Sequence, residues 1–286
     1  IRGDFEEAEA FYGAALHLRR ELGDERSIAL SLNHMGALHL QRGDVAAATQ
    51  HFRESLELRR KVGDQQGVVE SFNNLGILFL ERGEVDQAAS LLEEALTLAR
   101  KIGYRGVLCY ILNNLGELYL GLGKTVTARK HLDEAMSVAE DSGEQRALFD
   151  ILRNLGKVAL RESDRRVALE RTNEALAIAN QLDSQLLLGV GMNSLAELHA
   201  TYVFNSEFRD QSVLLAEQCY RDAIELLREI EHESELGKAL SSYGQFLIER
   251  GDPDLGRANL ERAREIFERL EMRTLWTATE QAIETL

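Results

Sequence analysis

The chain has 286 residues, a formal net charge of −15 at neutral pH, 44% hydrophobic residues and 28% charged residues. This acidic balance disfavours non-specific binding to nucleic acid and to anionic membrane surfaces. No apolar run approaches the roughly 18 residues of a transmembrane helix. Cys109 and Cys219 belong to no CxxC pair, which is typical of thiols in a reducing compartment. We therefore predict a cytoplasmic protein that contacts no membrane and does not bind nucleic acid directly.

The sequence favours an all-α chain. Pro253 is the single proline, and no run alternates apolar and polar residues over the length of a strand between turn residues. In the first full repeat, apolar residues recur at helical spacing over 25–42 and again over 44–62. Gly43 fits the left-handed residue that ends the first helix, and Asp44 fits the N-cap of the second.

One four-residue stretch recurs along the chain. The Asn-Asn-Leu-Gly of 73–76 returns at 113–116 and, with changes, at 33–36, 153–156 and 193–196, each 40 residues from the next. A sixth copy at 241–244 follows after 48 residues. A fixed period of this size predicts a solenoid, in which each repeat buries its apolar face against its neighbours.

The period divides the chain into units, which we take in order. We expect a single repeat array over 1–286, with a half repeat at 1–23 and full repeats at 24–63, 64–103, 104–143, 144–183, 184–231 and 232–271. The half repeat lacks its preceding helix, so we expect a fragment of a longer protein. Residues 272–286 match a first helix without a partner. They are expected to cap the final repeat, the alternative being a chain cut in mid-array.

The break in the period lies in the fifth full repeat. Eight extra residues fall near 203–212, where Tyr202, Phe204 and Phe208 are concentrated in a chain with only 6% aromatic residues. Insertions in solenoids map to loops, often on a binding face. Two interpretations stay open: a lengthened helix pair whose aromatic rings pack on one another, or an accessory contact site.

The pattern resembles the tetratricopeptide repeat (TPR). In the second full repeat the matching positions are Phe72, Leu75, Gly76, Phe79, Ala88, Leu92 and Ala95. The closing proline of that family is absent, and the period is 40 instead of about 34. This long form is similar to repeats of Pins/LGN-type spindle-orientation adaptors and of MalT-like bacterial regulators. The resemblance implies a right-handed α-solenoid of antiparallel helix pairs, with the first helices lining a concave surface that binds a protein or peptide.

A ladder of amides falls on the stripe that the resemblance places on the concave surface. Asn33, Asn73, Asn113 and Asn193 occupy one register, with Arg153 on the fourth rung. Because amides carry both donors and an acceptor, such a row can hold the backbone of an extended peptide. The alternative is that the amides bond neighbouring helices, a role for which the adjacent asparagines of the repeat are better suited.

Charged residues on the same stripe form a second candidate site. Arg153, Lys157 and Arg161 follow one another at i, i+4 and i+8, a slightly destabilising arrangement that a partner carboxylate or phosphate would offset. Tyr110 and Glu117 lie on the neighbouring stripe of the third repeat. Acidic residues on adjacent stripes, Glu117 among them, are the other candidates to neutralise the three cations.

The sequence contains no catalytic or metal-binding motif, such as HExxH or paired Cys/His zinc spacing. We therefore expect no enzyme and no cofactor. We expect a module that binds a partner peptide or helix in its concave groove, within a larger signalling or transcription regulator. The alternatives are a free-standing adaptor of the spindle-orientation type and a small-molecule or peptide sensor. Self-association through the exposed half repeat at 1–23 is a further expectation.

Overall fold

The computed structural model describes residues 2–41, 44–201, 209–270 and 272–285, and within these ranges the chain forms helices and no strand. A short 3-10 segment, Arg105–Val107, precedes α6. The α-helices are α1 (Arg2–Leu22), α2 (Glu25–Gln41), α3 (Val45–Lys61), α4 (Gln65–Glu81), α5 (Val85–Ile102), α6 (Leu108–Gly121), α7 (Thr125–Ser142), α8 (Gln145–Arg161), α9 (Arg165–Gln181), α10 (Gln185–Thr201), α11 (Arg209–Glu229), α12 (Glu233–Arg250), α13 (Pro253–Arg269) and α14 (Arg273–Glu284). The predicted all-α solenoid of antiparallel helix pairs is confirmed.

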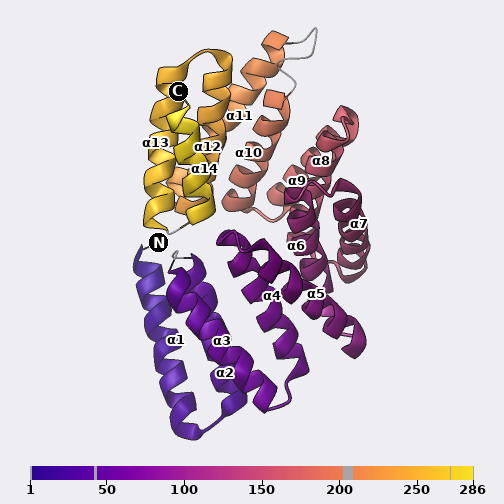
Figure 1. Ribbon diagram of the computed structural model, residues 1–286, viewed down its shortest axis with the longest axis vertical. Coiled ribbons are helices and arrows are strands. Elements are labelled where there is room, and N and C mark those ends of the chain that lie inside the picture. Colours follow the sequence, from indigo (N-terminus) through magenta and orange to yellow (C-terminus); the bar gives the residue numbers. More distant parts are fainter. Residues whose placement is uncertain (1, 42–43, 202–208, 271, 286) are drawn as a thin grey trace.

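The helices form two layers that curve together (Figure 1). Each even-numbered helix packs against the odd-numbered helix that follows it, and α2, α4, α6, α8, α10 and α12 also contact one another in succession. These first helices form the inner layer of the curve. The second helices, which are the odd-numbered helices from α3 to α13, form the outer layer.

Local sequence sets the helix ends. The Asp44 carboxylate accepts a hydrogen bond from the Ala47 N–H at 3.0 Å, and Asp164 accepts one from Val167 at 3.1 Å. Among the described residues, seven glycines that follow helices have positive φ, including Gly103 at 69°. Ser163, Asp183 and Glu231 take the same left-handed conformation at the corresponding points of the array. The position in the repeat therefore imposes the left-handed turn even where no glycine supplies it.

A largely continuous apolar core runs between the layers from the first full repeat to the last. Small residues allow the two layers to approach closely. A Cβ atom built on Gly116 would lie 2.5 Å from Cγ of Leu132, a side chain that is fully buried. Ala128, on the same outer helix, is also fully buried. The recurring Leu-Gly of the inner helices and small residues of the outer helices therefore fix the spacing within each pair.

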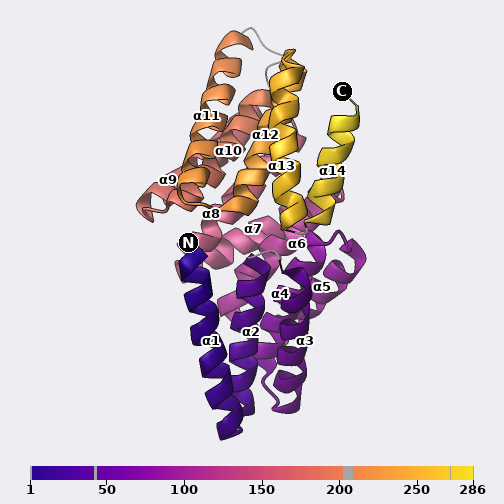
Figure 2. The ribbon, with the colours of Figure 1, turned by 90° about the vertical axis from the view of Figure 1, so that its left-hand side faces the viewer.

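The curvature brings the end of the array back to its second full repeat. Figures 1 and 2 show α12–α14 above the helices of the N-terminal half, with the ends of the two groups facing each other. The Thr274 hydroxyl donates a hydrogen bond to the Glu81 carbonyl at 3.4 Å, across 193 positions of sequence. The inner layer therefore faces the inside of the curve, where charged residues of both halves lie close enough to act on one another, and we call this concave side the groove.

The two ends differ in how they are covered. At the N-terminus, Leu16 packs against Ile28 and Leu32, whereas Phe11 and Leu22 are 66% and 81% exposed. The apolar face that the sequence offers for self-association is therefore open. At the other end, α14 packs against α13, and Arg264 forms an ion pair with Glu280 at 3.1 Å.

The aromatic cluster of the insertion, Tyr202, Phe204 and Phe208, lies outside the described residues.

Candidate functional site

The inner layer carries the predicted amide ladder, and the structure pairs it with the adjacent asparagines. The side-chain carbonyls of the first three ladder asparagines each accept a hydrogen bond from the following repeat. These bonds run from Asn74 to Asn33 at 2.9 Å, from Asn114 to Asn73 at 2.9 Å and from Asn154 to Asn113 at 3.0 Å. Both sets of asparagines therefore tie neighbouring first helices together.

Pairing uses only one end of each ladder amide. The Oδ1 atoms of Asn33, Asn73 and Asn113 are occupied, whereas their Nδ2 atoms donate to no group among the described residues. Asn73 and Asn113 are 7% and 8% exposed, so little more than an edge of each amide reaches solvent. The ladder thus offers donors but not the full donor and acceptor set of a free amide.

The fourth and fifth rungs depart from this pattern. Arg153 donates from Nε to the Ser194 hydroxyl at 3.0 Å, where the first three rungs have an amide pair. Asn193 donates to Oε1 of Glu197 at 3.0 Å, and Ser242 donates to the same oxygen at 2.8 Å. The buried Oδ1 of Asn193 accepts no hydrogen bond within the described part of the chain.

The three predicted cations differ in their surroundings. Arg153 lies 3.4 Å from the Asp150 carboxylate and stacks over the Phe149 ring at 5.5 Å, so its charge is largely met within α8. Lys157 is half-buried and Arg161 is exposed, and neither forms an ion pair among the described residues. These two cations are the ones that remain open to a partner.

The two predicted residues of the third repeat, Tyr110 and Glu117, also differ in their surroundings. The Tyr110 hydroxyl donates to Oε2 of Glu144 at 3.0 Å. Burial, together with this bond, raises the pKa of Tyr110 to about 12, so the hydroxyl stays protonated and committed to Glu144. Glu117 is exposed and has no ion-pair partner in the described ranges.

Charged groups from four inner helices act on one another across the groove. Lys238 of α12 forms an ion pair with Glu235 at 2.8 Å. Burial alone would lower the pKa of Lys238, but Glu235 first, and then Glu117 of α6 and Glu81 of α4, raise it above its usual value. Burial raises the pKa of Asp150 of α8, and Arg153 opposes this rise. We call Glu81, Glu117, Asp150, Arg153, Glu235 and Lys238 the groove charges.

Glu235 was absent from the sequence prediction, although its position three residues before Lys238 is a signal of an ion pair along a helix.

Replacing Glu81 with glutamine is expected to stabilise the fold at neutral pH. Burial raises the pKa of Glu81, and Lys238 only partly offsets this effect. Because the folded pKa lies above the unfolded one, the ionised carboxylate opposes folding, and stability rises as pH falls through the folded pKa. Urea unfolding at a series of pH values should show that the variant has a higher free energy of unfolding than the wild type at neutral pH. This difference should become smaller as the pH is lowered. Glu249→Gln, at the corresponding exposed position of the last repeat, is the control, and an equal gain there would contradict the prediction.

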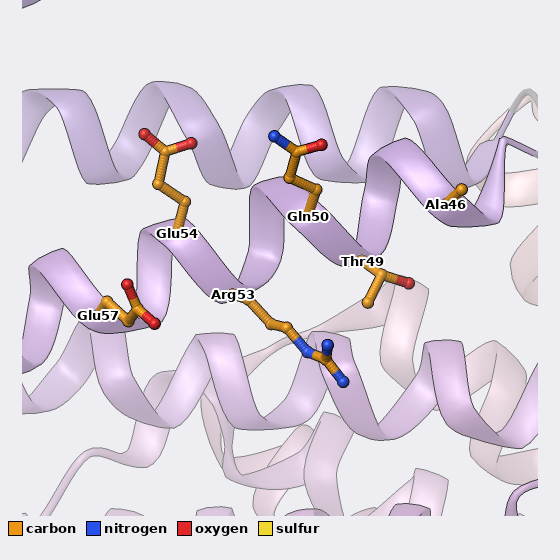
Figure 3. A pocket seen from close by; sticks show the side chains of 6 residues that line it. All are labelled: Ala46, Thr49, Gln50, Arg53, Glu54 and Glu57. Carbon is orange, nitrogen blue, oxygen red and sulfur yellow. The ribbon is translucent and has the colours of Figure 1, made fainter.

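The outer layer has a shallow hollow on α3 (Figure 3). Its lining residues, Ala46, Thr49, Gln50, Arg53, Glu54 and Glu57, all belong to that one helix. Such a surface does not converge on a ligand from several sides, as binding pockets do. None of the described helices is both long and apolar enough to cross a membrane.

The family model described as tetratricopeptide repeat matches residues 1–61, 27–101 and 107–181. The chain belongs to the tetratricopeptide repeat family. The matched segments together span more than half of the chain, in register with the helix pairs α2–α3, α4–α5, α6–α7 and α8–α9. None of the curated proteins compared with this TPR chain matches it.

Solved structures share the fold of this TPR chain at low sequence identity. A Rap protein complexed with competence and sporulation factor has a TM-score of 0.75 at 14% identity, covering 94% of this chain and 72% of that one. The Rap conjugation regulator of plasmid pLS20, in complex with the Phr* peptide, has a TM-score of 0.71 at 17% identity, covering 96% and 72%. NprR in complex with its cognate peptide NprX has a TM-score of 0.65 at 13% identity, covering 98% and 84%. The TM-scores establish a common fold.

Proposed function

We propose that this TPR chain is a non-catalytic module that binds a peptide segment of a partner in the groove of its inner layer. The observation that carries the proposal is the row of unbonded Nδ2 donors on Asn33, Asn73 and Asn113, which lies on the same layer as the groove charges. Donors at a repeating interval suit the carbonyl groups of an extended backbone. Three proteins of the same fold have structures with bound peptides or a signalling factor, which supports this choice.

The groove charges suggest how a peptide would be oriented. Lys238 and Arg153 are already paired with Glu235 and Asp150, whereas Glu117 has no ion-pair partner among the described residues. The cation Lys157 likewise has no ion-pair partner among the described residues. A peptide with one cationic and one anionic group would meet both, so charge would set its direction and the amide donors would hold its backbone.

Several finer roles fit a peptide-binding module. A sensor segment of a larger signalling or transcription regulator is the one we favour, because two of the similar structures are named as regulators or bind a cognate peptide. A free-standing adaptor and a small-molecule sensor are the alternatives. One similar structure is named aspartyl phosphate phosphatase F from Bacillus subtilis, at 12% identity and a TM-score of 0.70, and that identity carries the fold alone.

The expected result of a binding test is loss of affinity in a Lys157→Glu variant. Peptides selected from a displayed library on the wild-type chain should bind this variant about tenfold more weakly, since the change removes one attraction and adds one repulsion. Titration with labelled peptides gives the affinities, and circular dichroism verifies the fold.

Arg166→Glu is the control for this test, because Arg166 lies exposed on outer helix α9 and pairs with Glu170 of the same helix. An Asn113→Ala variant should also bind more weakly, through loss of an Nδ2 donor. Unchanged affinity in both groove variants would overturn the proposed site.

A further inference from the structure

The same ion pair connects the second helices of neighbouring repeats at two steps of the array. Arg20 of α1 pairs with Glu54 of α3 at 3.0 Å, and Arg100 of α5 pairs with Glu134 of α7 at 2.5 Å. In both pairs the acidic residue lies 34 positions after the arginine. The acidic position is repeated along the array by Glu54, Glu94, Glu134, Glu174 and Asp222.

The last step of the array breaks this rule. The position after Asp222 in the series is Arg262, and the residue 34 positions before it is Arg228. Two arginines therefore occupy the places that an arginine and a glutamate hold elsewhere. Neither forms a hydrogen bond or ion pair within the described part of the chain, and both are exposed.

At other steps that lack this ion pair, the charged residue interacts with another group of the protein. Glu174, which follows an acidic residue in the series, pairs with Arg171 of its own helix at 2.8 Å. Arg60 forms no ion pair with its acidic counterpart in the described part of the chain and stacks over the Phe72 ring at 5.3 Å. The Arg228 and Arg262 pair has no equivalent compensation.

The two arginines line a single cleft of about 410 Å³ between α11 and α13, whose other lining residues are Arg221, Ile224, Glu225, Tyr243, Leu255 and Asn259. Arg221 forms an ion pair with Glu217 at 2.5 Å and donates a hydrogen bond to the Tyr243 hydroxyl at 3.4 Å. Leu255 is 43% exposed and offers an apolar contact beside the charges. Among the lining residues, three arginines outnumber the one carboxylate of Glu225, which leaves the cleft cationic in a chain of net charge −15.

We propose that this outer cleft binds an acidic segment of a partner protein, with a partner carboxylate between Arg228 and Arg262 in the place that Glu54 and Glu134 hold in their own repeats. The arginine fork matches a carboxylate bidentately. A leucine or similar side chain of the same segment would rest on Leu255. The cleft lies on the outer layer, so this surface is separate from the peptide groove, and both can be occupied at once.

The acidic character of the whole chain does not prevent such binding. At physiological ionic strength the screening length is about 8 Å, so a bound carboxylate responds mainly to the charges in its own cleft. The same screening implies that the affinity should fall as salt is raised. A carboxylate is favoured over a phosphate because the 34-residue pairing accommodates a carboxylate in two other repeats.

The test uses the full chain and a rhodamine-labelled peptide of four glutamates and two leucines, followed by fluorescence anisotropy at physiological salt. The same peptide with glutamine in place of glutamate is the neutral control. We expect the acidic peptide to bind and the neutral one to bind at least about fivefold more weakly, as loss of charge pairing predicts.

Arg262→Glu is the decisive variant, because it supplies the arginine–glutamate pair that two other steps of the array have. The variant should bind the acidic peptide about tenfold more weakly than the wild type does. Its melting temperature should be unchanged or higher, since Arg228 gains an internal partner. Arg53→Glu, which makes the same charge change on exposed α3, should leave binding unchanged. Equal losses in the two variants would overturn the site. Binding of inorganic phosphate to the chain, without binding of the acidic peptide, would overturn the assignment to a carboxylate.

Discussion

Replacing Gly256 with valine is expected to destabilise the C-terminal end of the array by about 3 kcal/mol, the upper part of the range for overpacked cores. A Cβ atom on Gly256 would lie 2.8 Å from the Gly244 carbonyl oxygen and 3.1 Å from the Ile248 nitrogen. Both are backbone atoms of α12, which cannot move aside as the end of a side chain can. The two helices would have to separate.

The comparison with other repeats explains why this pair is the most sensitive. A Cβ on Gly76 would lie 3.6 Å from the Ala88 carbonyl, and one on Gly156 would lie 3.4 Å from the Ala168 carbonyl. The corresponding distance from Gly244 to the Gly256 carbonyl is 2.9 Å. The last pair is therefore packed more closely, and it has glycine where the others have alanine.

Gly13→Val is the matched control for this prediction. Gly13 lies within α1, and a Cβ added there would meet no atom within 4 Å. Valine and glycine differ little in helix propensity, so the control should be close to neutral. Because solenoid stability is nearly a sum over neighbouring repeats, hydrogen exchange should locate the loss of protection in α12–α14. Uniform loss along the chain, or equal effects of the two variants, would contradict the prediction.

The sequence was sufficient to predict the helix pairs, because each depends on contacts within one period. The Leu-Gly of 75–76, the N-cap at Asp44 and the stop at Gly103 all act within a few residues or on the adjoining helix. Even the left-handed turns at Ser163 and Asp183 follow from the register alone.

The arrangement of the groove depends on information that no single repeat contains. Small rotations between repeats accumulate, and their sum decides that Thr274 reaches the Glu81 carbonyl. The stripe placed Asn73 and Asn113 on the inner surface, but it did not reveal that the next helix lies close enough for Asn114 and Asn154 to occupy their carbonyl groups. Sequence spacing gives the face of a helix and not the distance to its neighbour.

Replacing Arg59 with alanine is expected to cost about 3 kcal/mol, the lower part of the range for removing one partner of a buried ion pair. Arg59 is only 2% exposed. Its guanidinium donates to the Gly67 carbonyl at 2.5 Å, to the Ser71 hydroxyl at 3.0 Å and to Glu70 at 3.1 Å. Glu70 also accepts from the Tyr104 hydroxyl at 2.8 Å, so the network connects α3, α4 and the segment before α6.

The chain itself shows what must accompany an arginine at this position. Arg19, one period earlier, bonds the Ser27 carbonyl and the Ser31 hydroxyl of the next helix. Where the position is alanine, the facing residues are apolar. Ala139, near the end of the third full repeat, is followed by the buried Ala147 and Ile151 of the fourth, at the places of Gly67 and Ser71. The polar and apolar versions are therefore alternative ways of filling the same space.

This alternation allows a rescue experiment that separates the polar network from simple loss of volume. The triple variant Arg59→Ala, Gly67→Ala, Ser71→Ile reproduces the apolar set of Ala139, Ala147 and Ile151. It should recover most of the lost stability, because apolar replacement of a whole buried polar group is often neutral or better. Arg60→Ala, on the same helix but exposed over the Phe72 ring, should cost less than about 1 kcal/mol, the usual scale of a surface cation–π contact. Urea unfolding of the four proteins gives the comparison. If the triple variant is no more stable than Arg59→Ala, the polar bonds of Arg59 are not what the apolar set replaces, and the two versions are not equivalent solutions.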